Sequence, residues 1–349
     1  MQLEVKIGKL LFKNPIIVGS AGYAENATGI ERFIKRGYAG VVTKSTAEKR
    51  LVGAPPPRVF WLDKYRRNWI DGSEGHRNPG IDEMVEEVKK CRELAEKENC
   101  HIIGSITCKS IEEAVSIAKK FEEAGVSAIE IDMVCPNVGE QLGPEYATRG
   151  GEYWSDPNHP ERAIELIKAV KNHVKIPLWC KINPKTLFLA GEKIMNEAPP
   201  DTFAYIGSGF PSFPLGLAID IDTEEPLFPG NVLLKIKKNM KFVPYAVIYP
   251  LLPTTVLTTA LLRKKISIPL IPSGGIQTGF DIIQCMMAGA NAVQICTAVY
   301  RDFDVVNTML REIKWFMAKK GYESIEEIIG VALKKIPFEL MEIPVGKSD

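Results

Sequence analysis

Eight short runs of apolar, β-favouring residues recur along the chain, and most are followed by a longer segment with the apolar spacing of an amphipathic helix. Strands that alternate with helices in this way form parallel sheets, because each helix returns the chain across one face of the sheet. Several runs are apolar almost throughout, as expected for strands buried on both faces. The expected strands are residues 15–20, 39–43, 101–106, 128–133, 177–182, 203–207, 269–272 and 292–297.

The clearest helical patterns between these runs cover residues 81–97, 110–124, 160–173 and 279–288. Asp82 and Ser110 stand where helix N-caps are expected, since their side-chain oxygens can accept hydrogen bonds from the first turn. Gly125 and Gly289 are expected to end their helices, because glycine readily adopts the left-handed conformation found there.

The number of strands favours a closed barrel over an open sheet. An open doubly wound sheet normally has fewer strands and a GxGxxG turn after the first one, whereas the first run here ends in GSAGY. We therefore predict an α/β fold of the (β/α)8 TIM-barrel class. No linker composition divides the chain, so residues 1–349 are expected to form one domain.

Three connections are too long to be simple turns, namely residues 44–80, 134–159 and 208–253. All three follow expected strands, which places them at the carboxyl end of the barrel, where enzymes of this fold build their sites. They are rich in Gly, Pro and aromatic residues, which favours ordered lids. The alternative is that they are surface insertions without a role.

Charge and cysteine content exclude several classes of function. There are 44 Lys and Arg residues against 43 Asp and Glu, a net charge of +1, so nothing favours nucleic acid or an anionic membrane surface. We find no apolar span of the roughly 18 residues that cross a membrane and no signal sequence, and expect a cytoplasmic protein. The seven cysteines contain no CxxC pair and the four histidines no ligand spacing, so no metal site is expected.

The strongest local signal for a ligand lies on the last two strands. Gly274 and Gly275 follow the seventh strand, and Cys296 and Thr297 follow the eighth. The loops after these strands form the usual phosphate site of such barrels, through backbone N–H groups that a glycine leaves accessible. A simple turn is the alternative explanation for the glycine pair.

Three further residues stand at the ends of expected strands. Lys44 follows the second strand in VVTKSTAEKR, Cys135 leaves the fourth in DMVCPNVG, and Lys181 lies on the fifth in WCKINP. Each is expected near the barrel mouth because it comes at a carboxyl end.

Taken together, these motifs resemble the dihydroorotate dehydrogenase family over essentially the whole chain. The matching elements, in order, are NP and SAG, TKSxxxKR, CPN, KxxP, SGGIQTGxD and AxxxQIxTA. Any one of them is common, but their joint order is specific.

The resemblance implies that the barrel binds FMN. In that family the flavin lies across the barrel mouth, and a positive charge beside it stabilises the reduced, anionic form. Cys135 matches the catalytic base of the cysteine-using, soluble branch, and Lys44 is implied as the second catalytic group. The implied flavin contacts are Ser20, Ala21, Gly22, Lys44, Ser45, Lys181, Gly274, Gly275, Cys296 and Thr297.

The chain departs from the family where the substrate is held. Relatives use asparagines there, but this sequence has DGSEGHRNPG, DMVCPN and AYIGSG at the corresponding motifs. An aspartate at neutral pH only accepts hydrogen bonds, whereas an asparagine also donates, so orotate itself is in question. The residues expected to line the substrate pocket are Gly72, Glu74, His76, Asp132, Asn137 and Tyr205.

We therefore predict an FMN-dependent oxidoreductase that acts on a dihydropyrimidine-like or other cyclic or conjugated substrate. The alternatives are a true dihydroorotate dehydrogenase, a flavin-binding subunit without turnover of its own, and a phosphate-substrate isomerase or aldolase with Lys181 as a Schiff-base lysine. The last leaves the TKS and CPN elements without a role. With no cluster motif in the chain, electrons are expected to pass to a small oxidant or a partner subunit, and the family resemblance implies a homodimer.

Overall fold

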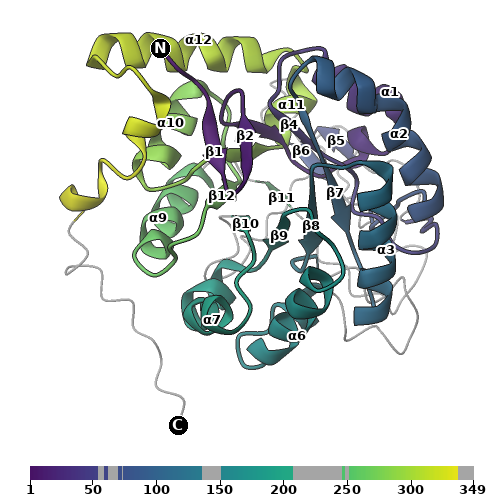
Figure 1. Cartoon of the computed structure of the whole chain (residues 1–349). Coiled ribbons are helices and arrows are strands. Elements are labelled where there is room, and N and C mark those ends of the chain that lie inside the picture. Colours follow the sequence, from purple (N-terminus) through teal and green to yellow (C-terminus); the bar gives the residue numbers. More distant parts are fainter. Residues whose placement is uncertain are drawn as a thin grey trace, which may run out of the picture.

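The computed structural model describes residues 1–53, 59–61, 70–72, 74–135, 151–206, 246–247 and 251–336. Within these residues, eight parallel strands close a barrel in the order β10-β12-β13-β3-β4-β7-β8-β9. Each of the eight expected strands is present, so the barrel prediction is confirmed (Figure 1). The strands are β3 (Ile16–Val18), β4 (Gly40–Val42), β7 (His101–Ile106), β8 (Ala128–Asp132), β9 (Leu178–Lys181), β10 (Thr202–Ile206), β12 (Leu270–Ser273) and β13 (Val293–Ile295).

The barrel closes because β13 pairs with β3, with Val293 opposite Ile16. Most strand residues are buried, since one face looks into the barrel and the other is covered by helices (Figure 1). The longer helices are α1 (Ala27–Ile34), α2 (Ile81–Lys97), α3 (Ile111–Ala124), α6 (Pro160–Lys171), α7 (Pro184–Glu197), α9 (Leu251–Arg263), α10 (Gly279–Met287) and α12 (Val305–Lys320). Shorter ones are α5 (Gly151–Trp154), α11 (Thr297–Arg301), η1 (Gly22–Ala24), η4 (Ile325–Ile328) and η5 (Leu333–Lys335).

The helix ends agree with the expected signals at three of four positions. Ser110 caps α3 by accepting a hydrogen bond from the Glu113 N–H, and Gly125 ends that helix in the left-handed conformation. Gly289, at φ 107°, follows the last turn of α10. The prediction for Asp82 was wrong: Gly80 is the N-cap of α2, and Asp82 lies in the first turn, where its charge favours the helix dipole.

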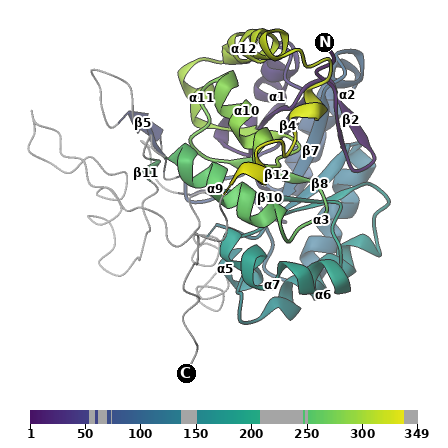
Figure 2. The same ribbon diagram turned by 90° about the vertical axis from the view of Figure 1, so that its left-hand side faces the viewer.

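Two small sheets outside the barrel were not expected. A hairpin of β1 (Val5–Ile7) and β2 (Leu10–Phe12) covers the amino end, where Phe12 packs against His101 and Trp179. On the opposite side (Figure 2), β6 (Ile70–Gly72) lies between β5 (Val59–Trp61) and β11 (Ala246–Val247). This sheet joins the first long connection to the third, at the carboxyl end of the barrel.

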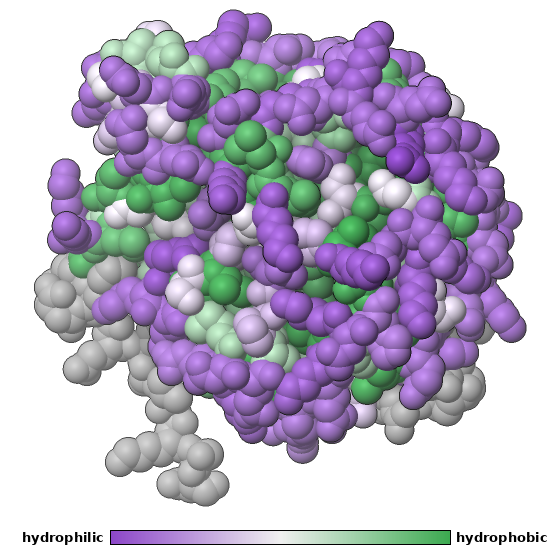
Figure 3. Space-filling view, viewed as in Figure 1, coloured by the Kyte–Doolittle hydropathy of each residue, from purple (hydrophilic) through white to green (hydrophobic). Residues whose placement is uncertain are grey.

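The surface seen in Figure 3 is largely hydrophilic, with apolar side chains showing between the charged ones. Among the helices of the described residues, none has the length and apolarity needed to span a bilayer. The apolar side chains are concentrated instead in one continuous core that includes the barrel interior and the inner faces of the helices.

Candidate functional site

A cluster of polar residues gathers at the carboxyl edge of four neighbouring strands. Lys44 follows β4, Ser105 lies in β7, Asp132 ends β8 and Lys181 ends β9. The parallel register sets these side chains at one level, with Asp132 directly opposite Lys181. Both lysines are only 8% exposed, although lysine is rarely buried without a partner.

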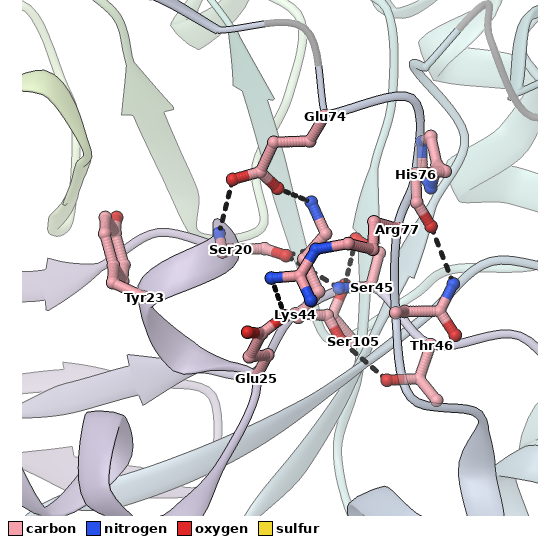
Figure 4. A network of polar contacts seen from close by, with 12 residues as sticks. Ser20, Tyr23, Glu25, Lys44, Ser45, Thr46, Glu74, His76, Arg77 and Ser105 are labelled. Atoms are coloured by element: carbon pink, nitrogen blue, oxygen red, sulfur yellow. Dashed lines mark hydrogen bonds and ion pairs between the residues drawn. The ribbon is translucent and has the colours of Figure 1, made fainter. Parts of the chain in front are cut away.

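Ser45 connects the neighbouring elements in this cluster. Its backbone N–H donates to the Ser20 hydroxyl at 2.9 Å, and its own hydroxyl donates to Asp132 Oδ2 at 3.1 Å. The same hydroxyl lies 3.1 Å from that of Ser20 and 2.9 Å from that of Ser105 (Figure 4). These bonds fix the turn after β3, the turn after β4 and the end of β8 relative to one another.

Glu74 extends over this cluster from the loop after β6. Its carboxylate forms an ion pair with Lys44 and accepts a hydrogen bond from the Gly22 N–H at 3.1 Å. The Tyr300 hydroxyl is 3.4 Å away. Burial acts to raise the pKa of Glu74, but the charge and hydrogen bond of Lys44 outweigh it, so the pKa lies below its usual value.

His76 comes from the same loop and faces Asp132, with Nε2 4.0 Å from Oδ2. Burial lowers the pKa of His76, so the ring is neutral at neutral pH. Burial would raise the pKa of Asp132, but the nearby His76 and Lys181 hold it below its usual value. His76 Nδ1 is buried and has no hydrogen-bond partner within the described residues.

The charge of Lys181 is influenced by the carboxyl groups of Glu130 and Asp132. Its Nζ is 3.7 Å from Glu130 Oε1. Glu130 is fully buried and lies two residues before Asp132 in β8. Gln294 of β13 donates to the other oxygen of Glu130 across the barrel. Burial alone would lower the pKa of Lys181, but Glu130 and Asp132 raise it, which keeps the ammonium charged.

The glycine turn after β12 has the backbone needed for close approach. Gly274 and Gly275 have φ values of 110° and 75°, which disfavour any residue with a Cβ. A Cβ on Gly275 would lie 2.3 Å from the Leu252 N of α9. Gln277 donates to the Thr297 hydroxyl at 2.8 Å, which ties this turn to the end of β13.

The other residues that the sequence predicts for the site lie at several places in the structure. Cys135 is partly exposed three residues beyond Asp132. Ala21 is buried beside Gly22, Cys296 contacts Tyr23, and Gly72 ends β6. Asn137 lies outside the described residues.

Tyr205 does not join the cluster, contrary to its expected place in the pocket. Its fully buried side chain donates to Thr259 of α9 at 2.8 Å, so it leaves the outer face of β10 toward the helices. Side chains alternate along a strand, and this position faces away from the barrel interior.

Sequence reasoning missed Ser105, Glu130 and Asn78. The first two are polar residues within otherwise apolar strands, a signal that was present in HIIGSI and AIEID. Asn78 is 1% exposed and holds the loop that carries Glu74 and His76. Its amide donates to the His76 carbonyl at 2.8 Å, while its oxygen accepts from the Ala47 N–H at 3.2 Å.

Comparisons with known proteins agree with this architecture. A family model described as dihydroorotate dehydrogenase matches residues 2–229 and 249–317. The catalytic subunit of dihydroorotate dehydrogenase B (NAD(+)) from Methanocaldococcus jannaschii is 30% identical over 332 residues, covering 95% of this chain and 98% of that protein. Dihydroorotate dehydrogenase A (fumarate) from Lactobacillus helveticus is 27% identical, covering 94% and 97%.

A solved structure gives the same fold. The dihydroorotate dehydrogenase of Eimeria tenella, crystallised with ferulenol, superposes with a TM-score of 0.72 at 18% sequence identity. The match covers 95% of this chain and 88% of that one, so the fold is shared over nearly the full length.

Proposed function

The chain belongs to the dihydroorotate dehydrogenase family, and we propose that it is an FMN-dependent enzyme that oxidises dihydroorotate to orotate. The observation that carries this proposal is the pair of buried lysines, Lys44 and Lys181, at the carboxyl edge of the barrel. Buried cations at this edge would stabilise negative charge that develops on a ligand beside them. The named relatives use two different acceptors, and both oxidise the same substrate by name, which favours dihydroorotate over the dihydropyrimidine-like substrates also considered.

The residues present fit FMN. The Ser20 hydroxyl and the two ammonium groups can donate to the oxygens and nitrogens of a flavin ring, and Ser45 fixes the Ser20 hydroxyl through its backbone N–H. The bare backbone of Gly274 and Gly275 can approach a phosphate, with Cys296 and Thr297 on the adjoining turn. When bound, FMN supplies a hydride acceptor.

The lysines, the serines and Cys135 have different roles in the proposed reaction. Lys44 and Lys181 supply fixed positive charge, and the serines orient the turns that carry them. The Cys135 sulfur takes the proton from the substrate carbon adjacent to the one that loses hydride, so that a proton and a hydride leave and a C=C bond forms. Its position beyond β8, partly exposed, allows a substrate to reach it.

The electron acceptor belongs to the same proposal. The relative from Methanocaldococcus jannaschii is named as a catalytic subunit, which favours a partner subunit that passes electrons onward. The chain holds no CxxC pair, so a redox centre carried by the partner would complete the path. A homodimer and a cytoplasmic location remain predictions.

Cofactor release and product formation test the proposal. Heat should release FMN, identified by mass spectrometry, at about one per chain, and the loaded protein should form orotate from dihydroorotate with an artificial electron acceptor. Release of FAD, or no flavin after reconstitution with FMN, would contradict the cofactor assignment. FMN without orotate formation would contradict the substrate assignment.

Asp132 favours a second candidate, a cyclic substrate that lacks a carboxylate. The lowered pKa of Asp132 keeps a negative charge in the pocket, and Glu74 adds another. Asp132→Asn would remove one of these charges and supply an amide donor. If the second candidate holds, this variant binds orotate at least tenfold more tightly than the wild type, as followed by the flavin spectrum. Equal affinities favour dihydroorotate.

A further inference from the structure

The Lys44 ammonium has a resident counter-ion. The ion pair with Glu74 is largely shielded from water, with the two side chains 11% and 17% exposed. Figure 4 shows the two side chains pointing toward one another above Ser45, with the Arg77 and Glu25 pair beside them. Glu74 lies two residues after Gly72, the position at which the family resemblance leads us to expect an asparagine.

We propose that Glu74 is a positioning residue that fixes Lys44 and cancels part of the positive charge that Lys44 presents to the cofactor. The effect on the cofactor rests on the proposed function, whereas the ion pair between Glu74 and Lys44 does not. A carboxylate shielded from water is unfavourable without a partner, so Glu74 stays anionic because Lys44, Arg77 and the Gly22 N–H stabilise its charge.

The surrounding loop is built to hold Glu74 in place. The Asn78 side chain bonds the backbone on both sides of its own position. It donates to the His76 carbonyl and accepts from the Gly80 N–H at 3.0 Å. Arg77 forms an ion pair with Glu25, which follows η1. The loop is therefore anchored at two points, and the carboxylate at its tip is directed at Lys44.

Gly22 provides the space that Glu74 occupies. A Cβ on residue 22 would lie 2.2 Å from Glu74 Oε1, the free end of a flexible side chain. Gly22→Ala would therefore displace the Glu74 carboxylate without moving backbone. A side chain at residue 22 and the Glu74 carboxylate cannot occupy the same space. Glu74 can therefore take its present position because residue 22 is a glycine.

The two lysines of the site differ in how their charge is balanced. Lys181 is held by Glu130 and Asp132 on strands of the barrel wall, whereas the partner of Lys44 comes from a loop. Charged groups that face Glu74 are Lys44 and Arg77, and both lower its pKa after burial has acted to raise it. With Glu74 anionic, the field of Lys44 is weakened, and a reduced, anionic flavin is stabilised less.

The test compares Glu74→Gln with Glu25→Gln, which removes an ion pair from the same loop without touching Lys44. In Glu74→Gln the equilibrium for flavin reduction should shift at least tenfold toward the reduced form, which for a two-electron couple is about 30 mV. Gly22→Ala should shift the equilibrium in the same direction. Glu25→Gln removes one anchor of the loop but keeps the pair between Glu74 and Lys44, so it should shift the equilibrium much less than Glu74→Gln does. An equal potential in wild type and Glu74→Gln, or an equal shift in Glu25→Gln, would overturn the inference.

A second readout uses the protein without flavin. Competitive acetylation, followed by peptide mass spectrometry, should modify Lys44 several-fold faster in Glu74→Gln than in the wild type, because the amine loses its partner. The exposed Lys35 serves as the internal reference. Faster acetylation in a protein that binds no FMN would retain the ion-pair inference and reject the proposed function. Unchanged acetylation in a protein that binds FMN would reject the inference alone.

Discussion

Charge at the barrel mouth is arranged residue by residue. Two ammonium groups, Lys44 and Lys181, face three carboxylates, and burial keeps His76 neutral. The carboxylates of Glu74 and Asp132 stay ionised because each has a cation and hydrogen-bond donors within reach. The lysines and the cysteine could be predicted from their strand ends, but these pairings could not, since Glu74 and Lys44 are 30 residues apart.

These pairings predict how the stability of the apoprotein depends on pH. Glu74 and Asp132 have pKa values below those they would have in the unfolded chain. Their contribution to the free energy of unfolding is therefore present above the ordinary carboxyl pKa of about 4 and is lost as pH falls through the lowered values. Urea unfolding between pH 6 and pH 3 should show a smaller loss of stability in Glu74→Gln than in the wild type. Identical profiles would mean that the Glu74 pKa is not lowered in the folded protein.

A substitution of Tyr205 tests whether this residue packs against α9 or lines the substrate pocket. Its hydroxyl donates to Thr259, which donates to the Thr255 carbonyl, so it belongs to the contact between β10 and α9. Tyr205→Phe should lower the free energy of unfolding by about 1 kcal/mol, the worth of one buried hydrogen bond, and leave the KM for dihydroorotate unchanged. A raised KM with unchanged stability would return Tyr205 to the substrate pocket.

At the scale of elements, predictability followed the sequence pattern around each element. The barrel strands could be predicted because apolar runs alternate with helical segments, and the helices α2, α3, α6 and α10 because they are long enough to show a period of apolar side chains. The strands β1, β2, β5 and β6 belong to no such alternation, and β6 pairs with β11 some 175 residues along the chain. Pairing at that distance leaves no local trace in a single sequence, so these strands were missed.

The conformation of the turn after β12 depends on Gly275. A side chain on Gly275 would meet the backbone of α9, and its φ of 75° adds strain. Gly275→Ala should therefore lower the free energy of unfolding by roughly 1–3 kcal/mol and weaken FMN binding by a larger factor than Gly37→Ala. Gly37 is the matched control, since it also has positive φ but no atom within 4 Å of its Cβ position. Equal flavin affinities in the two variants would place the phosphate elsewhere.

At the scale of the whole molecule, closure of the barrel brings the functional groups together. Lys44, Asp132 and Lys181 come from different parts of the chain and meet because parallel strands end at one edge. The hairpin β1–β2 covers the other end, and the small sheet lies on the opposite side (Figure 2). The fold could thus be predicted from the order of strands, while the substrate depends on a few side chains that the fold does not determine.

The most direct test of the account is anaerobic mixing of the FMN-loaded protein with dihydroorotate, followed by flavin absorbance. The account predicts that the yellow colour is bleached, that orotate forms in equal amount, and that Cys135→Ala slows the bleaching at least a hundredfold. Flavin that stays oxidised with dihydroorotate, while a carboxylate-free dihydropyrimidine bleaches it, would contradict the proposed function.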